Sequence, residues 1–189
     1  MTTTTLFLVR HAESVYMPGQ ERERGLSDQG DQDAFTIAEL LQHECIDLFL
    51  SSPYERVIRT IQPLADRLGK PIERIEALRE RAAGDFGNLS FAEAKRRLYS
   101  DFGLAFPGGE SGDAAQRRVM EGVEPILKRY AGRRIVIGTH GDIMTLLLNR
   151  WNPAYGYSFW ASTSMPDIYR LELEAEGAAA PRVTRIWNP

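Results

Sequence analysis

Two histidines stand directly after short apolar segments, next to groups that could take part in catalysis. His11 follows Leu6-Phe7-Leu8-Val9-Arg10, and His140 follows Ile135-Val136-Ile137-Gly138-Thr139. Short, β-prone apolar runs of this kind predict buried strands, so we expect both histidines at the C-terminal ends of strands. In α/β proteins that edge of the sheet is where ligands bind. The third histidine, His43, ends a predicted helix and is expected on the surface.

A metal site is one interpretation of this arrangement, because a carboxylate follows each histidine two positions later. The four candidate ligands are His11, Glu13, His140 and Asp142. Two arginines favour another ligand. Arg10 adjoins His11, and Arg56 is predicted in the first turn of the helix after the second strand. Fixed guanidinium groups repel a metal ion and suit an anion, and phosphate matches their bidentate geometry.

A phosphate flanked by a histidine suggests nucleophilic catalysis. A neutral imidazole at His11 could attack phosphorus and form a phosphohistidine, which splits one difficult step into two. The cationic groups would neutralise charge on the phosphoryl oxygens. A departing alkoxide also needs a proton, and Glu80, in the irregular loop over 77–90, is the candidate acid.

Strand and helix patterns alternate along the chain. Ser27 is typical of an N-cap before a helical pattern, and Ser52-Pro53-Tyr54-Glu55 fits a capping box that begins a second helix beside the candidate phosphate site. Strands are predicted within 6–9, 46–52, 72–78, 134–139 and 168–175, and helices within 27–41, 52–68, 91–101, 111–131 and 144–151.

This alternation predicts an α/β fold: a three-layer α/β/α sandwich with a mostly parallel sheet, whose later strands lie at an antiparallel edge. Length and the lack of a linker-like segment predict a single domain over residues 1–189.

Composition narrows the class of protein. The chain has 43% hydrophobic and 26% charged residues and a formal charge of −3, which gives no general attraction to nucleic acid or an anionic membrane. One cysteine, Cys45, excludes an intramolecular disulfide. The N-terminal MTTTT has no secretory signal character, and no stretch approaches a membrane span. We therefore expect a cytoplasmic protein that binds neither nucleic acid nor membrane.

Five segments resemble motifs of the histidine phosphatase superfamily, also called the phosphoglycerate mutase-like family, in the family's order. LVRHAES is similar to its R-H-G-E-[ST] motif and SSPYERVIRT to its S-S-P-x-x-R-x-x-x-T segment. LRER, PGGES and IVIGTHGD resemble its L-x-E-x motif, its G-E-S segment and its apolar strand ending in H-G. Each segment alone is a weak signal, whereas five in order are a strong one.

The resemblance implies a role for each matching position. His11 would be the phosphorylated nucleophile, and Glu80 the acid that protonates the leaving oxygen and then the base that activates water. No metal and no organic cofactor are expected. The phosphoryl oxygens would be held by Arg10, Arg56, His140 and the backbone of Gly141.

Three departures from the family pattern favour hydrolysis. Ala12 replaces the usual glycine, and Tyr16 and Met17 stand where mutase-like members carry tryptophan and asparagine. The stretch between Glu80 and Gly109 is also short for a mutase. The leading hypothesis is a metal-independent phosphomonoester hydrolase acting on a small phosphorylated metabolite. The alternatives are a cofactor-dependent phosphoglycerate mutase and a non-catalytic binder of a phosphorylated ligand.

Three segments are candidates for contacts beyond the phosphate: 17–25, 82–106 and 151–162. Arg22 and Arg24 alternate with glutamates in the first, which favours a solvated stretch over a second phosphate clamp. The third holds five aromatic residues, and packing under a loop is the favoured interpretation over a pocket lining or a subunit interface.

Overall fold

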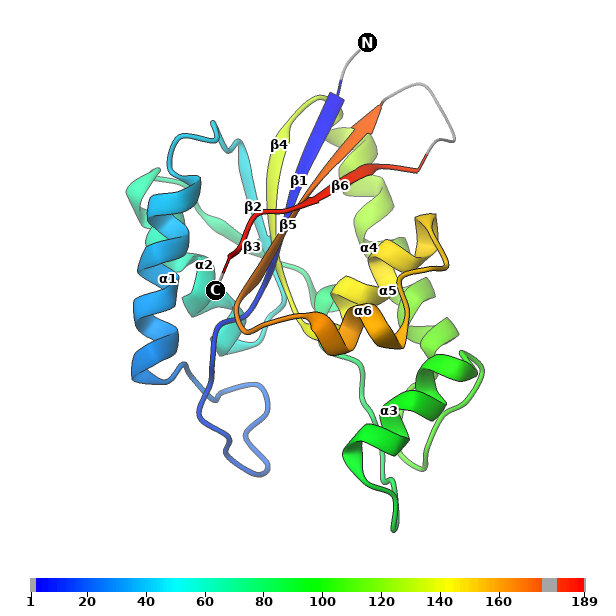
Figure 1. Ribbon diagram of the computed structural model, residues 1–189. Coiled ribbons are helices and arrows are strands. Elements are labelled where there is room, and N and C mark those ends of the chain that lie inside the picture. The colour runs from blue at the N-terminus through cyan, green and yellow to red at the C-terminus, as the bar shows by residue number, and fades with distance from the viewer. Residues whose placement is uncertain (1–2, 175–179, 189) are drawn as a thin grey trace.

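A six-stranded sheet forms the middle layer of the protein (Figure 1). The computed structural model describes residues 3–174 and 180–188. The strand order is β3-β2-β4-β1-β5-β6; the first four strands are parallel, and β5 and β6 form an antiparallel edge, as the sequence predicts. The strands are β1 (Thr3–Arg10), β2 (Leu48–Ser51), β3 (Ile72–Arg74), β4 (Arg134–Thr139), β5 (Asp167–Glu174) and β6 (Arg182–Arg185).

Helices cover both faces of this sheet, which confirms the three-layer α/β/α architecture (Figure 1). Helices α1 and α2 pack on one face, and α4 and α5 pack on the other. No helix in the described part of the chain has the length and apolar character needed to cross a membrane. The helices are α1 (Asp28–Leu41), α2 (Glu55–Arg67), α3 (Phe91–Ser100), α4 (Gly112–Arg129), α5 (Gly141–Trp151) and α6 (Tyr157–Ser162), with a 3₁₀ turn over Glu76–Leu78.

Strand β1 shows how the sequence builds two cores at once. Phe7 and Val9 point toward α1 and α2, whereas Leu6 and Leu8 point toward α4 and α5. Successive strand residues face opposite sides, so a continuous apolar run is what a strand covered on both faces requires. Burying each such side chain contributes about 1.5–3 kcal/mol. A register shift by one residue would exchange the two sets, so this packing fixes the position of His11 at the strand end.

The register of the parallel strands brings their polar ends together. Arg10 of β1 is opposite Thr139 of β4, and Ser51 of β2 is opposite Gly138. The backbone N–H of His11 donates to the Thr139 carbonyl at 3.0 Å, and that of Ser52 donates to the Gly138 carbonyl at 3.0 Å. The residues that follow the three strands therefore share one edge of the sheet.

The predicted helix start at Ser52 is wrong. Helix α2 begins at Glu55, and its N-cap residue Tyr54 makes no side-chain capping bond. The Ser52 hydroxyl lies 2.7 Å from His140 Nε2 instead. The same hydroxyl accepts from the backbone N–H of Tyr54 at 3.3 Å, so it contacts the residue before the helix and not the first turn of the helix.

Several other elements differ from prediction. The strand expected over 72–78 ends at Arg74 and gives way to the 3₁₀ turn. Strand β6 and helix α6 were not predicted, because both are short and neither follows a clear apolar period. The strand expected over 168–175 is β5, and residue 175 lies outside the described residues.

The two-sided core predicts that replacing two phenylalanines by alanine will lower the free energy of unfolding by very different amounts. Phe49 in β2 is fully buried between α1, α2 and the sheet, whereas Phe35 on α1 is 59% exposed. Phe49→Ala should lower the free energy of unfolding by about 3–5 kcal/mol through lost burial and the cavity left behind. Phe35→Ala should change it by less than about 0.5 kcal/mol. Urea unfolding checks both, and equal losses would contradict this packing.

Candidate active site

A cavity of about 780 Å³ opens at this sheet edge, a size usual for small-molecule sites. Five of the six predicted site residues line it directly. The sixth, His140, contacts the ring of His11 edge-on, with ring centroids 5.4 Å apart. The structure therefore brings the predicted residues into one place. The five lining residues are Arg10, His11, Arg56, Glu80 and Gly141.

The protein determines which nitrogen of His11 is free. Its Nδ1 lies 2.8 Å from the Ala12 carbonyl, which can only accept a hydrogen bond, so Nδ1 carries the hydrogen. Burial lowers the pKa of His11 to about 3, with the Arg56 and Arg10 charges acting in the same direction. The imidazole is consequently neutral at physiological pH, and its Nε2 keeps a lone pair that can act as a nucleophile.

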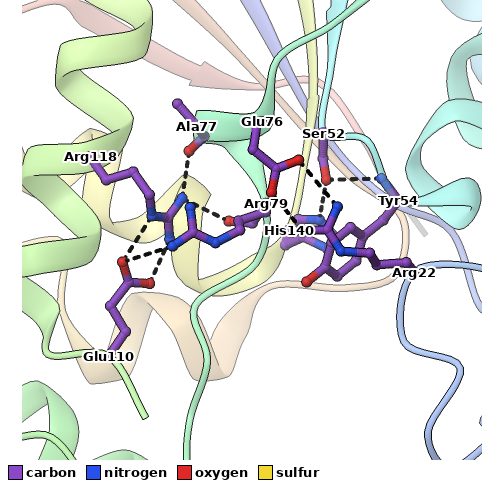
Figure 2. Close-up of polar contacts among 9 residues, drawn as sticks. All are labelled: Arg22, Ser52, Tyr54, Glu76, Ala77, Arg79, Glu110, Arg118 and His140. Atoms are coloured by element: carbon purple, nitrogen blue, oxygen red, sulfur yellow. Dashed lines mark hydrogen bonds and ion pairs between the residues drawn. The ribbon is translucent and has the colours of Figure 1, made fainter. Parts of the chain in front are cut away.

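His140 is held by protein groups at both ring nitrogens. Arg56 Nη2 donates to Nδ1 at 3.3 Å, so Nδ1 is the acceptor. The Nε2–H therefore donates to the Ser52 hydroxyl at 2.7 Å (Figure 2). Burial lowers the pKa of His140 well below its usual value, and the nearby His11 and Arg56 contribute. A contact from His140 to a phosphoryl oxygen would require the Nε2–H to leave Ser52.

Arg56 and Arg10 supply the positive charge. Arg56 is 2% exposed; its Nη1 donates to the Glu21 carbonyl at 2.6 Å, and its guanidinium carbon lies 4.9 Å from the centre of the Tyr54 ring. Burial lowers the pKa of Arg56 to about 10, so it stays cationic at neutral pH. Arg10 donates to the Thr163 hydroxyl at 2.5 Å. The Nε atoms of both arginines are buried without a hydrogen-bond partner among the described residues, so each is a cationic donor that could bind an anion.

Gly141 permits a close approach between the start of α5 and Arg10. A Cβ built at this glycine would lie 3.1 Å from the guanidinium carbon of Arg10. Gly141 is the first residue of α5, where backbone N–H groups lack intrahelical partners and favour anions. A side chain here would displace a guanidinium that lines the cavity.

Glu80 presents a carboxyl group from the loop after the 3₁₀ turn. The residue is half-buried, and its Oε1 accepts from the backbone N–H of Arg81 at 2.9 Å. Desolvation raises the pKa of Glu80 to about 7, and the charge of Asp142 adds to this rise. A carboxyl group with a pKa near neutrality can both donate and accept a proton at physiological pH.

A network of charged groups anchors the loop that carries Glu80 (Figure 2). Arg118 of α4 donates to both carboxylate oxygens of Glu110, at 2.8 and 2.6 Å. The same guanidinium donates to the carbonyls of Ala77 and Arg79, at 2.6 and 3.1 Å. These bonds join the PGGES segment to the residues just before Glu80, and so restrict where the acid can lie.

The interpretation of residues 17–25 as solvated is correct for Arg22 and wrong for Arg24. The Arg22 side chain is 48% exposed and pairs with Glu76 at 2.5 Å (Figure 2). The Arg24 side chain is 14% exposed, lines the cavity and pairs with Glu21 at 3.2 Å. The centre of the Tyr16 ring lies 5.7 Å from the Arg24 guanidinium carbon. Alternation with glutamates could not reveal this contact.

The aromatic residues of 151–162 divide between core and cavity. Trp151, Tyr155 and Phe159 pack against the core under α5, as the packing interpretation expects. Trp160 lines the cavity and lies 5.9 Å from Phe91, which lines it too. The segment thus has both a packing part and a pocket-lining part.

Glu13 and Asp142, the carboxylates considered above as metal ligands, instead contact other protein groups. Glu13 accepts from the Ser27 hydroxyl at 2.7 Å, and Asp142 is paired with Lys95 and with the Tyr99 hydroxyl. Across residues 3–174 and 180–188, no three His, Cys, Asp or Glu side chains are grouped so that they could hold a metal ion.

Lys95 is a cavity residue that the sequence analysis missed. It occupies a buried position of α3 together with Ala94, Leu98 and Tyr99. The available signal was spacing: Leu98 and Tyr99 follow Lys95 by three and four positions, which places the lysine on the same, buried face of the helix.

Comparison with known proteins agrees with this geometry. The model of the histidine phosphatase superfamily (branch 1) matches residues 6–185. "Phosphoglycerate mutase-like protein 4" of Arabidopsis thaliana is 32% identical over 165 residues, covering 79% of this chain and 71% of that protein. "Metal-independent phosphoserine phosphatase" of the same plant is 31% identical over 163 residues, covering 78% and 68%.

Longer relatives and solved structures also match. The chain spans 54% of a "Bifunctional protein" of Mycobacterium tuberculosis, with 27% identity over 196 residues that make up 96% of this chain. A mycobacterial glucosyl-3-phosphoglycerate phosphatase structure has the same fold, with a TM-score of 0.76, 23% identity and coverage of 98% of this chain and 99% of that one. The matched family model spans nearly the whole chain and includes every motif of the cavity. The chain belongs to the histidine phosphatase superfamily, branch 1.

Proposed function

We propose that this protein is a metal-independent phosphomonoester hydrolase that works through a phosphohistidine on His11. The single observation that carries the proposal is a neutral imidazole with a free Nε2, close to the buried guanidinium of Arg56 and the half-buried one of Arg10, in the cavity that also holds Glu80. Similar proteins include phosphatases of phosphoserine and of glucosyl-3-phosphoglycerate, which supports a small phosphorylated metabolite as substrate. A non-catalytic binder would have no use for an acid with a pKa near neutrality.

In the first half-reaction, the Nε2 lone pair of His11 attacks phosphorus as the bond to the leaving oxygen breaks. Glu80 gives its proton to that oxygen, and an alcohol departs. The guanidinium groups of Arg10 and Arg56 and the backbone N–H of Gly141 neutralise charge on the phosphoryl oxygens. The products are phosphorylated His11 and an ionised Glu80.

In the second half-reaction, the Glu80 carboxylate takes a proton from water while the water oxygen attacks phosphorus. The bond from phosphorus to Nε2 breaks and its electron pair returns to the imidazole. Inorganic phosphate leaves, His11 is neutral again, and Glu80 is protonated for the next cycle.

The first prediction concerns the nucleophile. Wild-type protein should hydrolyse p-nitrophenyl phosphate in excess EDTA, and His11→Ala should lower kcat/KM by at least about 10³-fold because no other group replaces Nε2. His43→Ala is the matched control, since His43 is exposed and outside the cavity, and it should retain wild-type activity. Activity abolished by EDTA would contradict metal independence, and activity that persists in His11→Ala would exclude the proposed nucleophile.

The second prediction concerns the acid. Glu80→Gln should lower kcat/KM for an alkyl phosphate by about 10²–10⁴-fold, and far less for p-nitrophenyl phosphate, because nitrophenolate leaves without a proton. Equal losses on both substrates would mean that another group is the acid.

The third prediction concerns pH. Protonated Glu80 is the active form in the first half-reaction, so kcat/KM for the alkyl phosphate should be high below its pKa of about 7 and fall as pH rises through it. This basic limb should be absent from Glu80→Gln. A pH–rate profile of both proteins checks it, and an unchanged limb in the variant would contradict the assignment.

A further inference from the structure

A buried ion pair joins α3 to the first turn of α5 at the cavity wall. Lys95 Nζ contacts Asp142 Oδ2, with the two side chains 6% and 2% exposed. Among the ion pairs of residues 3–174 and 180–188, this is the one in which both side chains are less than a tenth exposed. The Tyr99 hydroxyl donates to the other oxygen, Asp142 Oδ1, at 2.8 Å. Both carboxylate oxygens of Asp142 therefore have a hydrogen-bond donor.

Water has little access to this pair. The Lys95 ammonium lies 5.4 Å from the centre of the Phe91 ring and 5.2 Å from that of Trp160, so aromatic rings cover part of the charge. Charges in such surroundings are weakly screened and act on neighbours more strongly than surface charges do.

The pair shares the cavity with Glu80. Lys95, Asp142 and Glu80 all line it, so the acid is exposed to a positive and a negative charge on α3 and α5. No role in the proposed chemistry uses either member of the pair. Further charged or titratable groups lie around the acid: Arg10 at the end of β1, His11 after it, Arg56 on α2, Tyr99 on α3 and Arg81 beside Glu80 in the loop. The same cavity is also lined by Glu13, Tyr16, Glu21, Arg24 and Tyr54.

The two charges act on Glu80 in opposite directions. The negative charge of Asp142 raises the pKa of Glu80, and the positive charge of Lys95 lowers it, with Arg56 adding to the lowering. Either charge alone would favour one form of the carboxyl, whereas the proposed cycle uses both forms in turn.

We propose that Lys95 and Asp142 are positioning residues that act through Glu80, exposing the acid to a pair of opposed charges on the wall of the same cavity so that it can both donate and accept a proton. The inference rests on the proposed function. A purely structural pair, which only tied α3 to α5, would affect stability and leave the pH dependence of the reaction in place.

The test measures the pH at which kcat/KM for an alkyl phosphate falls, which is the position of the basic limb. It uses two variants that lose a charge and keep the ability to form hydrogen bonds. Lys95→Gln should move the limb to higher pH, because Asp142 is then uncompensated, and Asp142→Asn should move it to lower pH. Each shift should be about one pH unit. The double variant should return the limb close to its wild-type position, and Lys95→Arg should restore it. Lys95→Met replaces Lys95→Gln if the latter fails to fold, with the same upward shift expected.

The matched control is the half-exposed ion pair of Arg134 and Glu44, at the opposite end of β4 from the cavity. Arg134→Gln and Glu44→Gln should leave the limb where it is in the wild type. A limb that does not move, or that moves in the same direction in Lys95→Gln and Asp142→Asn, would overturn the inference while the proposed function stands. If the wild type hydrolyses no phosphomonoester, or the limb survives in Glu80→Gln, the proposed function fails and the inference fails with it.

Discussion

The site depends on a neutral imidazole kept beside two cations. His11 lies at the end of a strand that is covered on both faces, and burial lowers the pKa of its ring to about 3. The charges of the buried Arg56 and the half-buried Arg10 lower that pKa further. The same charges that prevent protonation of His11 would attract a phosphate. In the proposed mechanism, electrostatics thus keeps the ring in its neutral, nucleophilic form and also provides the field that attracts the substrate.

The fold serves this arrangement through register and anchoring. Parallel pairing of β1, β2 and β4 brings His11, Ser52 and His140 to one edge. Anchoring of the loop before Glu80 by Arg118 and Glu110 places a carboxyl group opposite them. The packed core forms a rigid framework, and the residues proposed to react lie at the strand ends and in the loops that it holds in place, as is usual in α/β proteins.

The sheet, its layers and the strand-end residues were predictable from the sequence. Apolar runs predict the buried strands, and Arg10-His11 and His140, which end or directly follow two of these runs, predict the site at the strand ends. Other features depend on contacts between distant segments. The Arg24 guanidinium lies close to the Tyr16 ring, and the buried Lys95 pairs with Asp142, 47 positions away. Ser52 fits a helix cap in sequence, yet its hydroxyl contacts a histidine 88 positions away.

The central claim is that phosphorus becomes bonded to His11 during turnover. The most direct measurement is rapid quenching of the protein during hydrolysis of an alkyl phosphate, followed by digestion under alkaline conditions and tandem mass spectrometry of the peptides. The account predicts a phosphoryl group on the imidazole of His11 that disappears once substrate is exhausted. Turnover with no covalent phosphate, or with the phosphoryl group on another residue, would contradict it.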